Sequence, residues 1–527
     1  MSGERTTYYI TTPIYYADSD LHIGHAYCTV AADALARFNR LRGRRTFFLT
    51  GTDEHGQKIE EKARSLGKEP LALVDEVVAR ILPLWERLGI SYDDFIRTTE
   101  PRHEAVVQAV FKRLHDQGDI YKAQYEGWYC TPCETFWLER QLGPEGRCPD
   151  CEREVRLLKE ESYFFRLSKY QDRLLEYIDR NPDFIQPPGR RNEMVSFVRQ
   201  GLEDLCVTRT TFDWGVPVPF DPDHVVYVWI DALTNYISAL GYLSDDPGKR
   251  ELFETFWPAD VHLVGKEIMR FHAVIWPILL MALGLPLPKR VYGHGWLVLD
   301  GGKMSKSKGN IIDPHLLMDK YGVDAVRYFL LREIPFGADG RYSEASLVER
   351  VNVDLANDLG NLLNRTLTMV EKYCGGVVPA PSPEADDRSL EGLLADVGPR
   401  VARAMDDLQI PPALETIWEL VDLGNRYIEE NAPWNLARDP AKRDRLDTVL
   451  YNLLEALRAV AQLLIPFLRE TPGRIWAQLG LDGDPAEVRW DEITGWGRLP
   501  PGTRVAKGQP LFPRIDPEAA LGRGEGE

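Results

Sequence analysis

The chain has 527 residues and a formal net charge of −18, from 81 acidic and 63 basic side chains. This length predicts about two to four domains, and a composition of 44% hydrophobic and 27% charged residues excludes a disordered or fibrous protein. The acidic balance argues against indiscriminate binding to nucleic acid or to anionic membranes, because both require positive charge. The start of the chain, MSGERTTYYI, has no basic region followed by an apolar stretch. We therefore expect no secretory signal, no membrane-spanning segment and a cytoplasmic location.

The first 60 residues are predicted to form a strand, a helix and a second strand. Thr6–Pro13 is a β-rich run, apolar residues recur at helical spacing from Gly24 onward, and Arg45–Leu49 is a short apolar run. The alternation of strand and helix resumes at Val225–Ile230 and again at Asp260–Gly265. This pattern predicts a parallel α/β sheet, with ligands bound beyond the carboxyl ends of its strands.

The rest of the chain departs from this alternation. From about Asp119 to Pro222 prolines punctuate the sequence, which indicates an insertion, and the apolar run 273–287 predicts a buried helix followed by a loop. After Ser343 the sequence predicts a helix bundle, and residues 516–527 are expected to be a frayed tail. Two apolar stripes at helical spacing indicate the bundle: Leu355, Leu359, Leu362, Leu363 and Val370, and Val449, Leu450, Leu453, Leu454, Leu457 and Val460.

Four of the seven cysteines lie in one 22-residue window, as Cys130-Thr-Pro-Cys133, fourteen residues, and Cys148-Pro-Asp-Cys151. Two CxxC pairs at this separation are typical of a tetrahedral zinc site with four cysteine ligands. Four thiolates leave no open coordination position, so we expect one structural Zn²⁺ and not a catalytic one. The alternative is four unrelated buried thiols.

Two other motifs suit a phosphate-bearing ligand. His22-Ile-Gly-His25 lies between the first strand and the first helix, and the N–H groups at a helix N-terminus favour phosphate. Lys303-Met-Ser-Lys306-Ser-Lys308 places three lysines in six residues, and such a loop can close over a polyphosphate. Capping or core histidines and a solvated lysine loop are the alternatives. Both motifs together, in this order on an α/β frame, favour a nucleotide site.

HIGH at 22–25 and KMSKS at 303–307 are the two signatures of class I aminoacyl-tRNA synthetases, and the chain resembles most closely the methionine-specific enzymes of that class. The resemblance extends over nearly the whole chain through TTPIYY (11–16), LTGTDEHG (49–56), YVWIDA (227–232) and NAPW (431–434). It implies an α/β fold with the Rossmann-type parallel sheet of class I synthetases, a zinc-knuckle insertion and an all-α anticodon-binding helix bundle. The expected limits are 1–118 and 225–300 for the two halves of the catalytic domain, 119–224 for the connective insertion, 301–350 for the KMSKS loop and stem-contact region, 351–510 for the anticodon-binding domain and 511–527 for a C-terminal tail.

The resemblance implies a methionine–tRNA ligase. Such an enzyme activates L-methionine with ATP to methionyl-adenylate and transfers it to the 3′-terminal adenosine of tRNA(Met), for initiation and elongation of protein synthesis. The implied catalytic residues are His22, His25, Lys303 and Lys306. The resemblance also implies that these four residues, with Gly24 and Glu267, bind ATP. Mg²⁺ is expected to accompany the ATP.

Methionine-contacting roles are also implied by the resemblance. Aromatic and aliphatic walls favour a polarizable thioether, and Asp53 can pair with the substrate ammonium. Core packing is the alternative for each apolar member. The implied residues are Ile14, Tyr16, Asp53, Trp229, Ala232, Leu233, Tyr236, Ile268 and His272.

For tRNA, the resemblance places anticodon readers at Asn361, Arg365 and Trp434, since Asn and Arg read base edges and an exposed Trp stacks on a base. Packing after Pro433 is the alternative for Trp434. Residues 1–340 carry about −8 of the net charge and residues 341–527 about −10. Binding is therefore expected to use a local basic strip, with candidates Arg365, Arg426, Lys303, Lys306 and Lys308. Homodimeric relatives carry an additional C-terminal tRNA-binding domain. Because this chain ends soon after the predicted helix bundle, we expect a monomer.

Two other functions stay open. The first is a class I synthetase for another amino acid. The leucine, isoleucine and valine enzymes carry an editing insertion much longer than the hundred or so residues of the insertion in this chain. The cysteine enzyme uses an active-site metal that a closed four-thiolate site does not offer. A tRNA-binding protein without catalysis is the second alternative. Intact HIGH and KMSKS motifs argue against it, because a pure binder has no use for a phosphate clamp.

Overall fold

The computed structural model describes residues 6–137, 139–299, 302–303, 311–383 and 387–520. Contacts divide the chain into two compact units. The first unit comprises residues 1–21, 46–86 and 91–295, and the second comprises 22–45, 87–90 and 296–527. No helix within the described ranges is both long and apolar enough to cross a membrane. The limits expected for the individual domains stay predictions.

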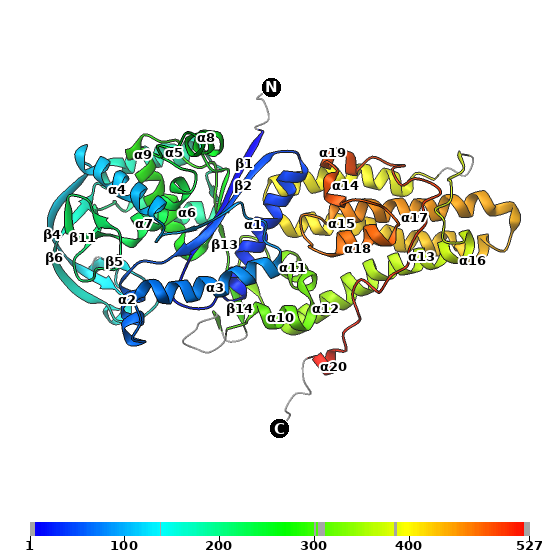
Figure 1. Cartoon of the computed structure of the whole chain (residues 1–527), viewed down its shortest axis with the longest axis horizontal. Helices are drawn as coiled ribbons and strands as arrows, with labels where there is room; N and C mark the ends of the chain where they lie inside the picture. Colours follow the sequence, from blue (N-terminus) through cyan, green and yellow to red (C-terminus); the bar gives the residue numbers. More distant parts are fainter. Residues whose placement is uncertain (1–5, 138, 300–301, 304–310, 384–386, 521–527) are drawn as a thin grey trace. The chain divides into compact units, whose positions relative to one another are not determined.

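A sheet of six described strands in the first unit has the order β3-β2-β1-β12-β13-β7. Figure 1 labels three of them, β1, β2 and β13. The strands are β1 (Thr7–Tyr16), β2 (Arg45–Asp53), β3 (Asp94–Arg97), β7 (Ile185–Gln186), β12 (Val261–Gly265) and β13 (Val291–His294). Pairing is parallel between β1 and β12, β12 and β13, β13 and β7, and β2 and β3. The predicted parallel α/β sheet is confirmed, and the carboxyl ends of its paired strands share one edge.

Helices of the first unit pack on this sheet and on one another. Helix α8 contacts β1, α4 contacts α7, and residues of β1, β2, β12 and α7 share one hydrophobic core. The helices and helical turns are α2 (Gln57–Ser65), α3 (Pro70–Leu88), α4 (Pro101–Asp116), η3 (Ser168–Tyr170), α5 (Gln171–Arg180), α6 (Pro188–Arg199), α7 (Val228–Ser238), α8 (Pro247–Phe256), η4 (Lys266–Ile268), η5 (Phe271–Ile275) and α9 (Trp276–Leu283).

The apolar run 225–230 is not a strand of the parallel sheet, contrary to the prediction from its sequence. Strand β11 (Asp221–Val226) ends inside this run and pairs antiparallel with β9 (Thr208–Arg209) and β10 (Pro217–Val218), and α7 then begins. Nearly every residue of α7 is buried, so its sequence shows no polar face at helical spacing. The sequence of the run 225–230 therefore has the pattern of a buried strand. The run 273–287 forms the predicted buried helix and loop, through η5 and α9.

Within residues 119–224 a separate antiparallel sheet has the order β5-β4-β6-β8. Its strands are β4 (Ile120–Cys130), β5 (Thr135–Trp137), β6 (Arg156–Phe165) and β8 (Leu205–Cys206). Strand β7, from the same segment, joins the parallel sheet beside β13. The segment therefore contributes both its own sheet and one edge strand of the main sheet.

The second unit contains α1 (Ile23–Leu41), a small sheet and a helical region. Both predicted apolar stripes are buried, and α14, α15 and α17 pack against one another (Figure 1). This confirms the helical C-terminal region. The elements are β14 (Leu297–Leu299), β15 (Gly302–Lys303), α10 (Pro314–Tyr321), α11 (Val323–Arg332), β16 (Gly340–Arg341), α12 (Glu344–Arg350), η7 (Val351–Gly360), α13 (Asn361–Cys374), α14 (Ser389–Asp406), α15 (Ile410–Asn431), α16 (Pro433–Leu436), α17 (Arg443–Leu463), α18 (Thr471–Gln478), α19 (Trp490–Ile493) and α20 (Pro517–Ala520).

A buried ion pair links elements of the second unit. Arg327 of α11 donates from Nη2 to Asp33 Oδ2 of α1 at 2.7 Å, and neither side chain is exposed. The same guanidinium donates to the backbone oxygens of Leu88 and Phe467 at 3.0 and 2.9 Å. Because removal of one partner leaves a buried charge, this pair constrains how the segments of the unit pack.

Replacing Asp33→Ala is expected to lower the free energy of unfolding by about 3–5 kcal/mol, because Arg327 stays buried without its counter-charge. Urea unfolding followed by circular dichroism measures the change. Lys112→Ala, which removes an exposed ion pair with Asp116, is the control and should leave stability unchanged. Equal stability of the two variants would contradict the assignment.

Candidate functional site

The HIGH motif forms the N-terminus of α1. His22 is the N-cap residue: its Nδ1 accepts the N–H of Gly24 at 3.1 Å, and Nδ1 of His25 accepts the N–H of His22 at 3.0 Å. The two rings lie 3.9 Å apart between centroids. Since each Nδ1 accepts a hydrogen bond, the proton of each neutral ring is on Nε2, which can donate to a phosphate oxygen.

The segment that follows the KMSKS motif meets the same helix terminus. The N–H of Ile23 donates to the backbone oxygen of Ile312 at 3.0 Å, within the second unit. Lys303 belongs to β15 and pairs with Val298 of β14, whereas residues 304–310, with Lys306 and Lys308, lie outside the described residues. The fold thus brings the HIGH motif and the chain just beyond KMSKS into direct contact.

Asp53, the last residue of β2, has a buried and incompletely paired carboxyl group. Its backbone oxygen accepts the N–H of Ala17 at 2.8 Å, which joins the ends of β1 and β2. The Oδ1 atom has no hydrogen-bond partner among the described residues. Burial, followed by the charges of Asp231 and Glu134, raises the pKa of Asp53 well above its usual value. A cation that binds here would favour the charged carboxylate.

A hydrogen-bonded set of aromatic side chains adjoins the core of the first unit. The Tyr236 hydroxyl donates to Nε2 of His272 at 2.8 Å, and His272 Nδ1 donates to the backbone oxygen of Ile268 at 2.9 Å. Burial lowers the pKa of His272 to about 4, so the ring is neutral at pH 7. The Tyr9 hydroxyl donates to the backbone oxygen of Tyr236 at 2.8 Å. These bonds fix both the orientation and the protonation of the polar groups.

The remaining predicted methionine-contacting residues lie in the same unit. Trp229 stacks on Phe271 at 3.6 Å between centroids and 5° between planes, and lies edge-on to His272 at 6.3 Å. Leu233 and Tyr236 belong to the hydrophobic core, and Ala232 lies beside them on α7. Among the partly buried side chains that pack against that core are Ile14, Tyr16, Trp229 and Ile268. Glu267 is exposed after the end of β12.

A buried charge network was not identified from the sequence, although the motifs that contain two of its members, His55 and Asp231, were recognised. Asp231 accepts hydrogen bonds from His55 Nδ1 and His103 Nε2, each at 2.7 Å. Burial opposes its ionisation, but the two histidines lower the pKa of Asp231 to about 2. The pKa of His55 is raised despite burial, chiefly by Asp231. An aspartate that directly follows the apolar run 225–230 was the available signal.

The four cysteines of the two CxxC pairs come together as predicted. Their sulfur atoms all lie within 4.8 Å of one another, with Cys130 to Cys151 at 3.5 Å and Cys133 to Cys148 at 4.0 Å. Zn–S bonds of about 2.3 Å in a tetrahedron place the sulfurs about 3.8 Å apart, so this cluster fits a zinc ion. A hydrogen bond from Cys133 lowers the pKa of Cys130 to about 6, whereas burial raises that of Cys148 to about 11.

Glu134, next to the cluster, is a second group that the sequence did not single out. It is only 6% exposed, and its Oε1 accepts the Tyr16 hydroxyl at 3.0 Å. Its backbone oxygen accepts the Tyr227 hydroxyl at 2.7 Å. Burial raises the pKa of Glu134 to about 7. The residue that follows Cys133, a predicted metal ligand, thus touches a residue of the predicted methionine pocket.

The predicted anticodon readers lie in the helical region of the second unit. Asn361 and Arg365 are one turn apart on α13, and Arg365 pairs with Glu429 of α15 at 2.6 Å. Trp434 of α16 is 37% exposed, which leaves part of its indole available for stacking. Arg426 is also exposed on α15.

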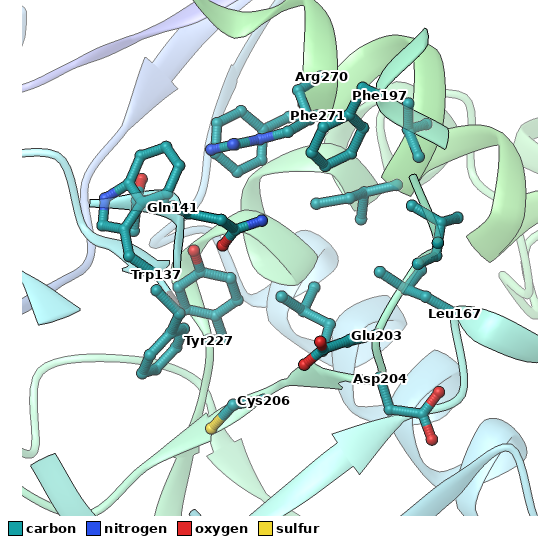
Figure 2. Close-up of a pocket in the computed structure, with 17 residues that line it drawn as sticks. Trp137, Gln141, Leu167, Phe197, Glu203, Asp204, Cys206, Tyr227, Arg270 and Phe271 are labelled. Carbon is teal, nitrogen blue, oxygen red and sulfur yellow. The ribbon is translucent and has the colours of Figure 1, made fainter. Parts of the chain in front are cut away.

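A cavity of about 120 Å³ lies beside Trp137 and Phe271 (Figure 2). Trp137 and Tyr227 line it together with Arg270 and Phe271. Figure 2 shows Arg270, Phe197 and Phe271 at one end of the cavity and Asp204 at the other.

Known proteins resemble this chain over nearly its full length. The family model described as "tRNA synthetases class I (M)" matches residues 8–157 and 153–367. A methionine–tRNA ligase of Caldanaerobacter subterraneus subsp. tengcongensis is 59% identical over 518 residues, which cover 98% of this chain and 80% of the relative. That of Bacillus subtilis is 53% identical over 534 residues, or 99% and 80% of the two chains.

Solved structures give the same result. The crystal structure of Mycobacterium tuberculosis methionyl-tRNA synthetase bound by methionyl-adenylate matches with a TM-score of 0.91 and 44% identity, over 96% of this chain and 100% of that chain. The apo form of the M. tuberculosis enzyme matches with a TM-score of 0.86 and 41% identity, over 98% and 99% of the two chains.

Proposed function

The chain belongs to the methionine-specific class I aminoacyl-tRNA synthetases, and from this premise we propose how its own residues carry out the reaction. It is a ligase that activates methionine with ATP and charges tRNA with the product. The observation that supports the proposed site is the hydrogen bond of Ile23 to Ile312, which joins the HIGH motif to the chain that follows the KMSKS motif. Both motifs therefore act on one nucleotide.

In the first step the methionine carboxylate attacks the α-phosphate of ATP, which forms methionyl-adenylate and releases pyrophosphate. A carboxylate is already a nucleophile, so the protein contributes position and charge stabilisation and no general base. His22 and His25 donate from Nε2 to the triphosphate at the positive end of α1, and Gly24 permits close approach. Lys303 and Lys306 neutralise the β- and γ-phosphates, and Glu267 contacts the nucleotide.

Methionine binds with its ammonium group on Asp53, whose Oδ1 has no partner among the described residues. The aromatic and aliphatic residues around Trp229 and Tyr236 enclose the thioether. Neutral His272 presents no charge to this apolar side chain, because burial lowers its pKa to about 4. A cationic amino-acid side chain gains no counter-charge from these walls, which favours methionine.

In the second step a hydroxyl of the 3′-terminal ribose of tRNA(Met) takes the methionyl group; class I membership implies the 2′-OH. We place the anticodon on Asn361, Arg365 and Trp434, because the exposed Trp434 offers a stacking surface and the two polar residues share one face of α13. The strip of Arg365, Arg426, Lys303, Lys306 and Lys308 would supply positive charge to the phosphates.

The metal of the cysteine cluster is proposed to be Zn²⁺ with a structural role, held by Cys130, Cys133, Cys148 and Cys151. Mg²⁺ would accompany ATP and offset its negative charge. A cytoplasmic location and a monomeric state stay predictions.

Amino-acid-dependent exchange of pyrophosphate into ATP tests the proposed substrate directly. Methionine should support exchange, whereas leucine, isoleucine, valine and cysteine should not at equal concentration. Exchange that is fastest with any of these four would contradict the proposal.

Lys306→Ala is expected to slow methionine-dependent exchange by about 100-fold or more, because it removes a cation from the transferring phosphates. Methionine affinity, measured by calorimetry, should stay within about twofold of wild type. Lys320→Ala, which alters an exposed lysine paired with Glu344, serves as the control. Unchanged exchange turnover in Lys306→Ala would remove this residue from the site.

Methionine affinity is expected to fall as the pH falls through the raised pKa of Asp53, because only the ionised carboxylate binds the ammonium. The loss should begin at a higher pH than for an ordinary Asp carboxyl, whose pKa is about 3.9. Asp53→Asn should weaken binding by at least about tenfold and flatten this profile. Titration calorimetry from pH 8 to pH 5 measures both effects, and an identical profile in the variant would refute the assignment.

One zinc ion per chain is expected by atomic emission spectroscopy, since four thiolates complete a tetrahedral shell. Cys133→Ser should reduce the zinc content, whereas Cys374→Ser, outside the cluster, should retain it. Equal zinc content in the two variants would exclude the cluster as the metal site.

A further inference from the structure

Two contacts connect the cysteine knuckle, residues 130–151, with opposite parts of the predicted methionine pocket. The first is made by Glu134, which directly follows Cys133. Its side chain is buried and holds the Tyr16 hydroxyl, while its backbone holds Tyr227.

The turn after Asp53 is shaped to admit this contact. Gly56 has a φ of +113°, and a Cβ there would lie 2.4 Å from Glu134 Oε1 and 2.9 Å from the Tyr16 hydroxyl. Glycine is therefore required for steric as well as conformational reasons. The turn, Tyr16 and Glu134 form one close-packed unit, so a displaced knuckle displaces Tyr16.

The second contact is made by Arg270, which precedes Phe271. Its guanidinium carbon lies 4.6 Å from the ring centroid of Trp137, 5.4 Å from that of Phe271 and 5.6 Å from that of Phe197. Trp137 is buried in a small cluster with Cys130 and Cys148. Arg270 also lies 3.9 Å from the carboxylate of Asp150, between the last two cysteines.

The Arg270 guanidinium lies beside Phe271, whose ring stacks on Trp229. Phe271 lies flat on Trp229 at 3.6 Å, and it also lines the cavity of about 120 Å³ (Figure 2). Since the cavity leaves space beside Phe271, the contact with Arg270 is what restrains the ring on that side.

The knuckle has too small a core to hold these positions alone. Its buried cluster consists of Cys130, Trp137 and Cys148, with a few partly buried neighbours. A cluster of this size needs a crosslink, which a metal ion on the four thiolates would supply.

We propose that Glu134 and Arg270 are positioning residues through which the metal-loaded knuckle sets the affinity of the methionine pocket. Glu134 fixes Tyr16, and Arg270 fixes the stack of Phe271 on Trp229. The inference rests on the proposed methionine pocket and zinc site, and it adds a route by which the metal acts on substrate binding without touching substrate.

The first test uses Glu134→Ala and Arg270→Met in the full chain. Each should raise the methionine Kd, measured by calorimetry, by about tenfold, while the KM for ATP stays within about twofold. The conservative variants Glu134→Gln and Arg270→Lys should restore most of the affinity, because they keep an acceptor and a cation. Two control variants leave the pocket intact. Arg166→Met removes a guanidinium whose carbon lies 4.3 Å from the ring centroid of Tyr121, and Asp221→Ala removes a carboxylate that accepts the Tyr163 hydroxyl.

The second test removes the metal with a chelator and restores it with Zn²⁺. In wild type the methionine Kd should rise about tenfold and recover on adding Zn²⁺. In the double variant Glu134→Ala/Arg270→Met the Kd should change less than about twofold on chelation, because the connection is already lost. Tryptophan fluorescence of each form on titration with methionine gives an independent measure.

An unchanged methionine Kd in both single variants, or an equal rise in the KM for ATP, would overturn the inference. So would the same fold-change on chelation in wild type and in the double variant. Failure of the metal-loaded wild type to bind methionine would overturn the proposed function as well, whereas normal wild-type binding with unaffected variants would overturn this inference alone.

Discussion

The parallel pairing of buried strands is the constraint on which the first unit depends. Strands β1, β2 and β12 are neighbours in one sheet, and the bond from Ala17 to Asp53 joins the ends of β1 and β2. Polar groups brought to this edge must be paired, because an unpaired buried group costs about 1–3 kcal/mol. Most of them are paired within the protein, whereas Asp53 Oδ1 has no hydrogen-bond partner among the described residues and would be satisfied by a substrate.

The protein pairs its other buried charges so that they do not compete for the substrate. Glu54 is held by Arg97 at 2.7 Å, and Asp231 is held by His55 and His103. His262 accepts the Trp276 indole N–H at 3.1 Å, and burial lowers its pKa well below the usual value. The Asp53 carboxyl thus keeps a spare acceptor beside neutral aromatic walls, which suits an amino acid with an uncharged side chain.

Sequence patterns predicted the features that rest on local chemistry. The position of the HIGH motif at the start of the first helix, the close approach of the four cysteines and the buried stripes of the bundle follow from spacing and residue type alone. The run 225–230 was misassigned because α7 is buried on almost all sides and so carries no helical periodicity. Glu134 and Arg270 escaped detection because their partners, Tyr16 and Trp137, are more than a hundred residues away in sequence, and only the folded chain brings them together.

The central claim is that the spare oxygen of Asp53 is reserved for the ammonium group of methionine. Its most direct test is a calorimetric comparison of methionine with its des-amino analogue, which lacks only that group, on the wild-type chain at pH 8. The account predicts that the analogue binds at least about tenfold more weakly, because the charged hydrogen bond to the carboxylate is lost. Equal affinity for the two ligands would contradict it.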